Sequence, residues 1–218
     1  KPNRLEAAKD VAAEFINGRP NDNIGITLFA GETFTQCPLT VDHAVLLDMI
    51  HNIKCGLIED GTAVGMGIAN AVTRLKDSKA KSKVIILLTD GTNNKGDISP
   101  LTAAEIAKSF GIRVYTIGVG TNGMAPYPYP VGNTVQYVNM PVEIDEKTLT
   151  QIAGTTDGNY FRATSNSKLK EVYEEIDKLE KTKLNVKEYS KRDEEYQWFA
   201  LAAFLCVLLE VLLRNSLL

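Results

Sequence analysis

The run VIILL, residues 84–88, constrains the fold more than any other stretch of this chain. It contains no polar residue, and it is followed at once by Thr89, Asp90 and Gly91. A strand that is apolar on both faces is typical of the centre of a parallel sheet, which helices cover on both sides. In open α/β sheets ligands bind beyond the carboxyl ends of the strands, where Asp90 would lie. We therefore expect an α/β fold with Asp90 at its ligand-binding edge.

Strand-like and helix-like segments alternate along most of the chain. Helical spacing of apolar residues predicts helices at residues 4–17, 42–52, 64–75 and 167–184, a helix from Pro100 to the stop at Gly111, and another that begins at Asp145. Strands are expected at residues 24–30, 34–39, 84–89, 112–119 and 159–163. The second is expected at a sheet edge, because Pro38 cannot donate to a ladder. This alternation favours a doubly wound, mostly parallel sheet.

Residues 120–140 interrupt the alternation with three prolines and a Gly-Asn turn. We interpret them as an inserted loop and hairpin at the rim of the sheet. The tyrosines of this stretch could form a contact surface, and a rigid proline-rich excursion without a partner remains the alternative.

Composition excludes several classes of protein. The 218 residues are 44% hydrophobic and 23% charged, which is typical of a globular domain. The net charge of −3 does not suggest a nucleic-acid partner. The three cysteines, Cys37, Cys55 and Cys206, form no CxxC motif, so neither a zinc site nor a disulfide framework is indicated.

The end of the chain differs from the rest. Residues 198–213, WFALAAFLCVLLEVLL, carry one charge, Glu210, which can pair with Arg214 four residues later. A helix that is apolar on all sides is either buried or spans a membrane. We expect a domain over residues 1–184, a juxtamembrane stalk over 185–197 and a transmembrane helix over 198–218; a helix buried against protein is the alternative.

Two oxygen-bearing side chains are candidates for a metal site. Thr62 lies in a glycine-flanked loop that leads into the helix at 64–75, and Asp90 ends the strand at 84–89. A hydroxyl and a carboxylate suit a hard divalent cation. Other motifs fail: the loop after Asp90 lacks the final Glu of an EF-hand, and Gly118 to Gly123 matches GxGxxG but no helix is expected after it. His43 and His51 are interpreted as solvated or capping residues, and no nucleophile with a base is apparent, so no catalytic residue is assigned.

Four stretches together resemble the von Willebrand factor A (VWA) domain: VIILLTDGTNN, DGTAVGMGIANAV, IGITLFAGETFTQCPLT and IRVYTIGVGT. The resemblance covers residues 1 to about 184 and the C-terminal membrane helix, and is closest to the bacterial, membrane-anchored BatA-like aerotolerance proteins. It implies a metal-ion-dependent adhesion site, in which Thr62 and Asp90 match two of the ligands. The Asp-x-Ser-x-Ser loop of that site is absent. We expect this loop and the first, central strand to precede Lys1, so the chain resembles an N-terminally truncated VWA domain.

The function implied by the resemblance is protein binding at a membrane. The family site holds Mg²⁺ (or Mn²⁺ or Ca²⁺), which an acidic side chain of a partner completes; binding by the present chain is expected to be weak or absent. Related VWA membrane proteins and a MoxR-type AAA ATPase are the implied partners, in an envelope complex related to aerotolerance or stress. The implied location is the bacterial inner membrane, with residues 198–218 in the lipid and the VWA domain in the periplasm. No nucleic-acid partner is expected.

Two other functions remain open. One is a structural, membrane-tethered domain without a metal, in which Asp90 caps amides of its own loop. The other is a metal-assisted hydrolase that uses Asp90 together with Asp97 or Glu59.

A missing central strand would leave two unpaired edges, one on residues 24–29 and one on residues 84–89. Since unpaired ladders and bared apolar faces are costly, we expect the space to be filled. The candidates are a strand of a second chain, the apolar tail of a neighbour, or direct pairing of the two half-sheets.

Overall fold

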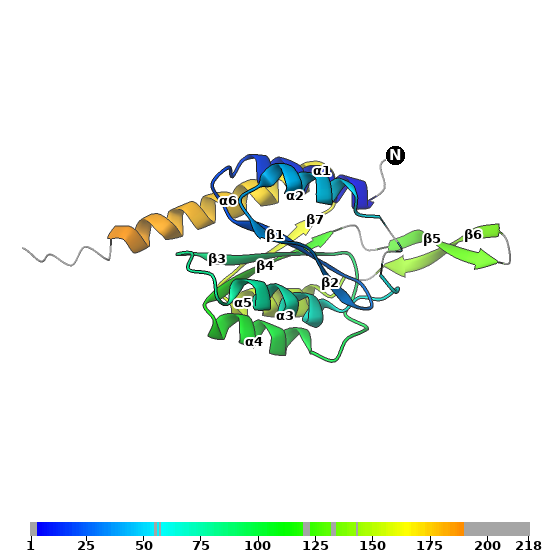
Figure 1. The fold of residues 1–218 in the computed structure, drawn as a ribbon. Coiled ribbons are helices and arrows are strands. Elements are labelled where there is room, and N and C mark those ends of the chain that lie inside the picture. The colour runs from blue at the N-terminus through cyan, green and yellow to red at the C-terminus, as the bar shows by residue number, and fades with distance from the viewer. Residues whose placement is uncertain are drawn as a thin grey trace, which may run out of the picture. The chain divides into compact units, whose positions relative to one another are not determined.

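The computed structural model describes residues 4–54, 56, 58–119, 123–131, 134–142 and 144–189. Its contacts divide the chain into two compact units, Lys1–Glu180 and Lys181–Leu218. Figure 1 shows the elements of the first unit as an α/β arrangement with helices on both faces of a sheet.

The elements follow the predicted alternation closely. They are α1 (Arg4–Asn17), β1 (Ile24–Phe29), β2 (Thr33–Thr40), α2 (His43–His51), α3 (Val64–Leu75), β3 (Lys83–Thr89), α4 (Pro100–Ser109), β4 (Ile112–Val119), β5 (Gly123–Val131), β6 (Thr134–Val142), α5 (Glu146–Thr155), β7 (Tyr160–Ala163) and α6 (Asn166–Tyr189). Side chains fix three helix starts, because Asp42, Ser99 and Asp145 each accept a hydrogen bond from a backbone N–H of the first turn. Helix α6 continues five residues beyond the predicted end at residue 184.

The described strands form separate sheets. Strands β3, β4 and β7 are parallel and lie in that order, whereas β1 pairs with β2 in an antiparallel ribbon. The alternative in which the two half-sheets pair directly is therefore wrong: β1 and β3 share no ladder. Among the described strands none pairs with the edge of β3 opposite β4, and what fills that edge stays a prediction.

Two helices bridge the separate sheets, one on each face. On one face, α3 packs Ile68 with Ile85 of β3, and its Gly67 lies against the ring of Phe29 at the end of β1. On the other face, Phe15 of α1 packs against the same buried cluster as Val84, Ile86 and Leu88 of β3. Ile16 of α1 belongs to a separate cluster, against which Ile24 and Ile26 of β1 pack. No side chain of β1 is fully buried, although apolar residues dominate it. The interval between β1 and β3 thus lies between two helices that contact both sheets.

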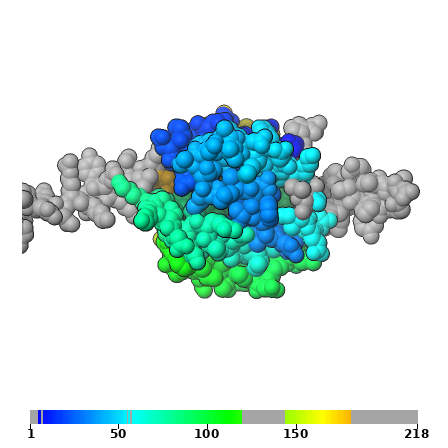
Figure 2. Space-filling view, in the orientation of Figure 1, coloured from blue at the N-terminus to red at the C-terminus, as the bar shows by residue number. Residues whose placement is uncertain are grey.

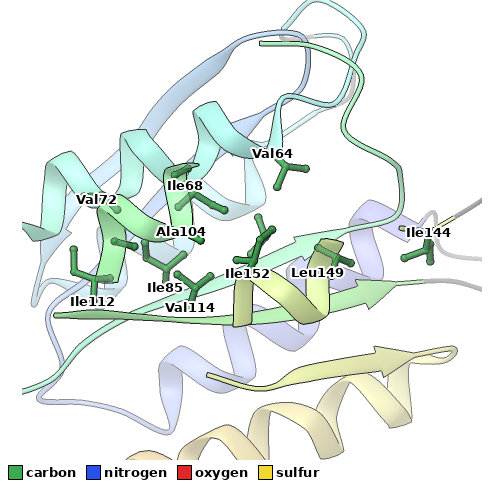
Figure 3. Packing of buried hydrophobic residues seen from close by; sticks show 13 residues of the cluster. Val64, Ile68, Val72, Ile85, Ala104, Ile112, Val114, Ile144, Leu149 and Ile152 are labelled. Atoms are coloured by element: carbon green, nitrogen blue, oxygen red, sulfur yellow. The ribbon is translucent and has the colours of Figure 1, made fainter. Parts of the chain in front are cut away.

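The larger cores lie on the two faces of the three-stranded sheet. Figure 3 shows Val64, Ile68 and Val72 of α3 directed at the strands, where they meet Ile85, Ile112 and Val114. The alternate residues of the same strands face the opposite side, where Tyr115 and Ile117 pack with Leu169, Val172 and Ile176 of α6. Burial on both faces is what the apolar run at 84–88 predicted.

A buried carboxylate fastens the first part of α6 to the sheet. Glu180 is 5% exposed and accepts hydrogen bonds from the Tyr115 hydroxyl at 2.6 Å, the Ser82 hydroxyl at 2.8 Å and the Arg113 guanidinium. Burial alone would raise the pKa of Glu180, but the hydrogen bonds from Tyr115, Arg113 and Ser82 outweigh it and lower the pKa. Burial and the Glu180 carboxylate raise the pKa of Tyr115 to about 12.

The predicted hairpin is confirmed, with its prolines in the strand rather than in a loop before it. Strand β5 pairs with β6 in an antiparallel ladder that runs from Gly123 and Val142 to Val131 and Thr134. Pro126, Pro128 and Pro130 occupy every second position of β5. Since proline has no backbone N–H, these three positions donate no ladder hydrogen bond, as is typical of a strand at the edge of a sheet.

Within the described residues no helix is both long and apolar enough to span a membrane. The predicted transmembrane helix at 198–218 and most of the predicted stalk lie outside those residues.

Candidate functional site

The first part of the site is the loop Glu59–Ala63, which leads into α3. Gly61 has a φ of +150°, and a Cβ atom there would lie 2.7 Å from Lys95 Cγ and 2.9 Å from Gly31 Cα. A residue with a side chain is therefore excluded at this position by both conformation and space. Close packing of the loop holds the half-buried Thr62 at the start of α3.

The second part is the turn at the end of β3. Thr89 is buried, and its hydroxyl accepts a hydrogen bond from Gly91 N and donates to Gly91 O, both at 3.3 Å. This pair of bonds folds the backbone tightly around Asp90, which is exposed. The strand–turn geometry thus presents Asp90 to solvent at the carboxyl edge of the sheet.

The two loops meet, although Thr62 and Asp90 lie far apart in the sequence. A Cβ atom on Gly91 would lie 3.2 Å from Thr62 Oγ1, so the Thr62 hydroxyl packs directly on the residue after Asp90. A larger residue at position 91 would fill the space beside this hydroxyl. The structure therefore places Thr62 beside the Asp90 turn; that both ligate one cation stays a prediction.

Hydrogen bonds between the loops involve two residues to which the sequence assigned no role. Asn94 Oδ1 accepts from Thr62 N at 2.8 Å, Asn94 N donates to Thr62 O at 3.0 Å, and Asn93 Oδ1 accepts from Val64 N at 2.8 Å. The sequence signal was the Asn pair itself, which favours turns and side-chain to backbone bonds but does not identify a partner some 30 residues away.

The donor set fits a hard cation only in part. A hydroxyl and a carboxylate are suitable oxygen ligands, and the packing at Gly91 leaves the Thr62 hydroxyl beside the turn. The described residues contain no group of three or more His, Cys, Asp or Glu that could hold a metal ion. Thr62 and Asp90 would therefore be two of several ligands, because Mg²⁺ requires close to six.

Other polar candidates have different surroundings. His43 Nε2 lies 2.9 Å from the backbone oxygen of Asp22, in the loop between α1 and β1. The Glu59 carboxylate is 3.9 Å from Lys95 Nζ, and both side chains are largely exposed, as is Asp97. Cys37 is a free, buried cysteine in the small core under β1 and β2.

Fold and site together define an α/β module with an oxygen-rich loop pair at the carboxyl edge of its sheet. The profile of the von Willebrand factor type A domain matches residues 2–175, so this chain belongs to that family.

Two curated relatives agree with this assignment. An uncharacterized protein of Borreliella burgdorferi is 28% identical over 208 residues, with 95% of this chain and 61% of the relative covered. A UPF0353 protein of Mycolicibacterium paratuberculosis is 31% identical over 188 residues, with 79% and 52% covered. The chain thus spans about half to three fifths of the length of these relatives.

Three solved structures are similar to the chain. BatB of Bacteroides thetaiotaomicron is 33% identical with a TM-score of 0.72, and 83% of this chain and 90% of that one are covered. An aerotolerance-related membrane protein of Bacteroides fragilis is 30% identical with a TM-score of 0.70 and coverages of 82% and 88%. The mussel byssus protein PTMP1, solved with a zinc-occupied MIDAS (metal-ion-dependent adhesion site) motif, is 25% identical with a TM-score of 0.63 and coverages of 82% and 41%.

Proposed function

We propose that this chain is the protein-binding module of a membrane-anchored, Bat-related protein, and that Thr62 and Asp90 contribute to its metal-ion-dependent adhesion site. The single observation that carries the proposal is the contact between the Thr62 hydroxyl and the Asp90 turn. The similarity to BatB and to an aerotolerance-related membrane protein supports the cellular context. The zinc-occupied MIDAS motif of PTMP1 supports the proposal that a metal ion binds at this site.

The residues suggest how such a site would work. A divalent cation at this edge would offer a coordination position to an acidic side chain of a partner. Thr62 would supply a neutral ligand and Asp90 a charged one, so this chain's own ligands would leave most of the cation's charge available to the partner. We propose Mg²⁺ or Mn²⁺ as the ion, and other proteins, including related VWA membrane proteins and a MoxR-type AAA ATPase, as the partners.

The remaining ligands are proposed to come from the Asp-x-Ser-x-Ser loop of the family. The interval between β1 and β3, bridged by α1 and α3, is the place where a central strand carrying that loop would fit. Its carboxyl end would lie beside Thr62 and Asp90 if it ran parallel to β3. We propose that a strand carrying this loop occupies the interval.

Binding rather than catalysis is proposed because the residues near Asp90 suit it better. A hydrolase would need a base close to Asp90, and the sequence candidates Asp97 and Glu59 are exposed, with Glu59 near Lys95. The structural alternative, a tethered domain without a metal, predicts no cation dependence at all.

Titration with Mn²⁺, followed by the loss of the free-ion signal in electron paramagnetic resonance, tests the proposal. It is run on residues 1–218 and on a longer version that begins upstream of Lys1, which should bind more tightly. Thr62→Val keeps the shape of the side chain but removes the hydroxyl, and should weaken binding in the longer version. Thr92→Val is the matched control, since Thr92 is exposed in the neighbouring loop. Equal affinity of the two variants would contradict the assignment of Thr62.

A further inference from the structure

Asn94 satisfies both backbone groups of Thr62. Its side-chain oxygen accepts from Thr62 N at 2.8 Å, and its own N–H donates to Thr62 O at 3.0 Å. The two residues are 32 positions apart. Lys95 N also donates to Thr62 O, at the longer distance of 3.4 Å. The position of the Thr62 backbone, and with it the direction of its hydroxyl, is thus set mainly by Asn94, in the loop after Asp90.

Asn93 extends the same arrangement by one step. Helix α3 begins after Ala63, whose side chain cannot cap it. Asn93 Oδ1 accepts from Val64 N at 2.8 Å and therefore caps α3 from a different loop. A cap usually comes from the residue just before the helix, so this bond ties the start of α3 to the Asp90 loop instead.

The same short loop is also bonded to the other sheet. Ala63 N donates to Ala30 O, and Gly31 N donates to Glu59 O, both at 2.7 Å, so the loop is fixed to the end of β1. Since β1 and β3 share no ladder, the hydrogen bonds of Asn93 and Asn94 join the two sheets at this edge. Figure 2 shows the blue surface of the first elements in direct contact with the cyan and green surface of those that follow.

Charge explains why amides suit this role. An Asn oxygen accepts a hydrogen bond from an N–H without adding a negative charge. A carboxylate at position 94 would compete for a cation nearby and repel an acidic partner. A neutral acceptor at position 94 avoids both effects.

We infer that Asn93 and Asn94 are positioning residues of the Thr62–Asp90 site, which hold the Thr62 hydroxyl against the Asp90 turn by clamping the loop before α3. The role assigned to Asn93 and Asn94 rests on the proposed function. The hydrogen bonds that define the clamp do not require a bound metal. Without the side chains of Asn93 and Asn94, the loop before α3 would keep its hydrogen bonds to the end of β1 but would no longer be held in position beside the Asp90 turn.

Amide hydrogen exchange of the 218-residue chain, measured by NMR without metal, tests the clamp. In Asn94→Ala the Thr62 amide should exchange roughly fivefold faster, and in Asn93→Ala the Val64 amide should do so, because each loses its acceptor. Asn94→Asp keeps an acceptor oxygen and should restore the protection of Thr62. Thr92→Ala, a change at an exposed residue of the same loop, should leave both amides unchanged.

Two results would overturn the inference. One is equal exchange of Thr62 in Asn94→Ala and Thr92→Ala. The other is a parallel loss of protection at Val114, a buried amide that is hydrogen-bonded to Thr156 in the core, since Asn94 would then serve overall stability rather than position.

Titration with Mn²⁺ separates the clamp from the proposed function. If the longer version of the chain binds Mn²⁺, Asn94→Ala should weaken binding and Thr92→Ala should not; unchanged affinity in Asn94→Ala would reject the positioning role. If that version does not bind Mn²⁺, the proposed function fails, and the exchange experiment still decides whether the clamp exists.

Discussion

At the scale of single residues, the site depends on close packing between backbones of different loops. Gly65, in the first turn of α3, shows this most clearly, because a Cβ atom there would lie 2.0 Å from Ile98 O. The chain after Asn94 therefore passes directly over the start of α3. The same segment carries Asn93 and Asn94, which bond to Val64 N and Thr62 N, respectively, at the start of this helix.

Substitution of Gly65 by Ala should therefore destabilise the domain. The added methyl group meets backbone, which cannot rotate away, and overpacking of this kind costs about 1–3 kcal/mol. Gly154→Ala in α5 is the matched control: its Cβ would have no atom within 4 Å, and Ala in a helix is favoured by about 0.5–1 kcal/mol over Gly. Urea unfolding should show opposite shifts for the two variants; a Gly65→Ala protein as stable as the original would refute the close approach.

At the scale of elements, α6 is fixed to the sheet by a buried polar group. Glu180 lies in α6 and is the last residue of the first unit. Its carboxylate accepts hydrogen bonds from Ser82, just before β3, and from Arg113 and Tyr115 of β4. The hydrogen bonds from these donors stabilise the ionised carboxylate in the folded state. The first unit therefore ends at a charged anchor, on the helix that leads towards the tail.

Glu180→Gln should destabilise the domain by about 1.5–3 kcal/mol at neutral pH, the usual contribution of a hydrogen-bonded charged group. Glu175→Gln, an exposed position of the same helix, should change stability by less than about 0.5 kcal/mol. Urea unfolding checks both, and similar effects would show that the anchor is unimportant.

The pH dependence of stability tests the same anchor. Because the folded-state pKa of Glu180 lies below its ordinary value of 4.5, its contribution is complete above that value and is lost as the pH falls through the folded-state pKa. The original protein should therefore lose more stability between neutral and strongly acidic pH than Glu180→Gln does. Parallel stability curves would contradict this assignment of charge.

The same elements show what the sequence could predict. Periodicity located α1, α3, β3 and β4 almost to the residue, because each carries its own local signal. The juxtaposition of Thr62 with the Asp90 turn followed from strand order and family resemblance. The roles of Asn93, Asn94 and Glu180 did not, because their partners lie 29 to 98 positions away and nothing local distinguishes Glu180 from the exposed glutamates of α6.

At the scale of the whole molecule, a domain with separate sheets is followed by an apolar end. The described part of the chain leaves one edge of β3 without a strand, and the unit beginning at Lys181 continues into residues 198–213. We propose that the first feature marks the place of the central strand and that the second anchors the protein in the inner membrane, with the domain on the periplasmic side.

The anchor gives a prediction for the intact chain. Residues 1–218 should partition into detergent or lipid vesicles, because 16 nearly uncharged residues form most of a membrane span. A chain that ends at Tyr196 should stay in the aqueous phase. Phase separation in detergent followed by protein detection distinguishes the two, and an intact chain found in water without detergent would remove the spanning interpretation.

The most direct test of the central claim is the Mn²⁺ titration with the carboxylate changed. Asp90→Ala and Asp97→Ala each remove one exposed carboxylate from the same loop. They differ in whether the carboxylate that is removed is the proposed metal ligand. In the version that begins upstream of Lys1, the account predicts that Asp90→Ala abolishes Mn²⁺ binding, with an unchanged unfolding midpoint, whereas Asp97→Ala binds like the original protein. Equal binding by Asp90→Ala and Asp97→Ala would contradict a metal site at this edge of the sheet.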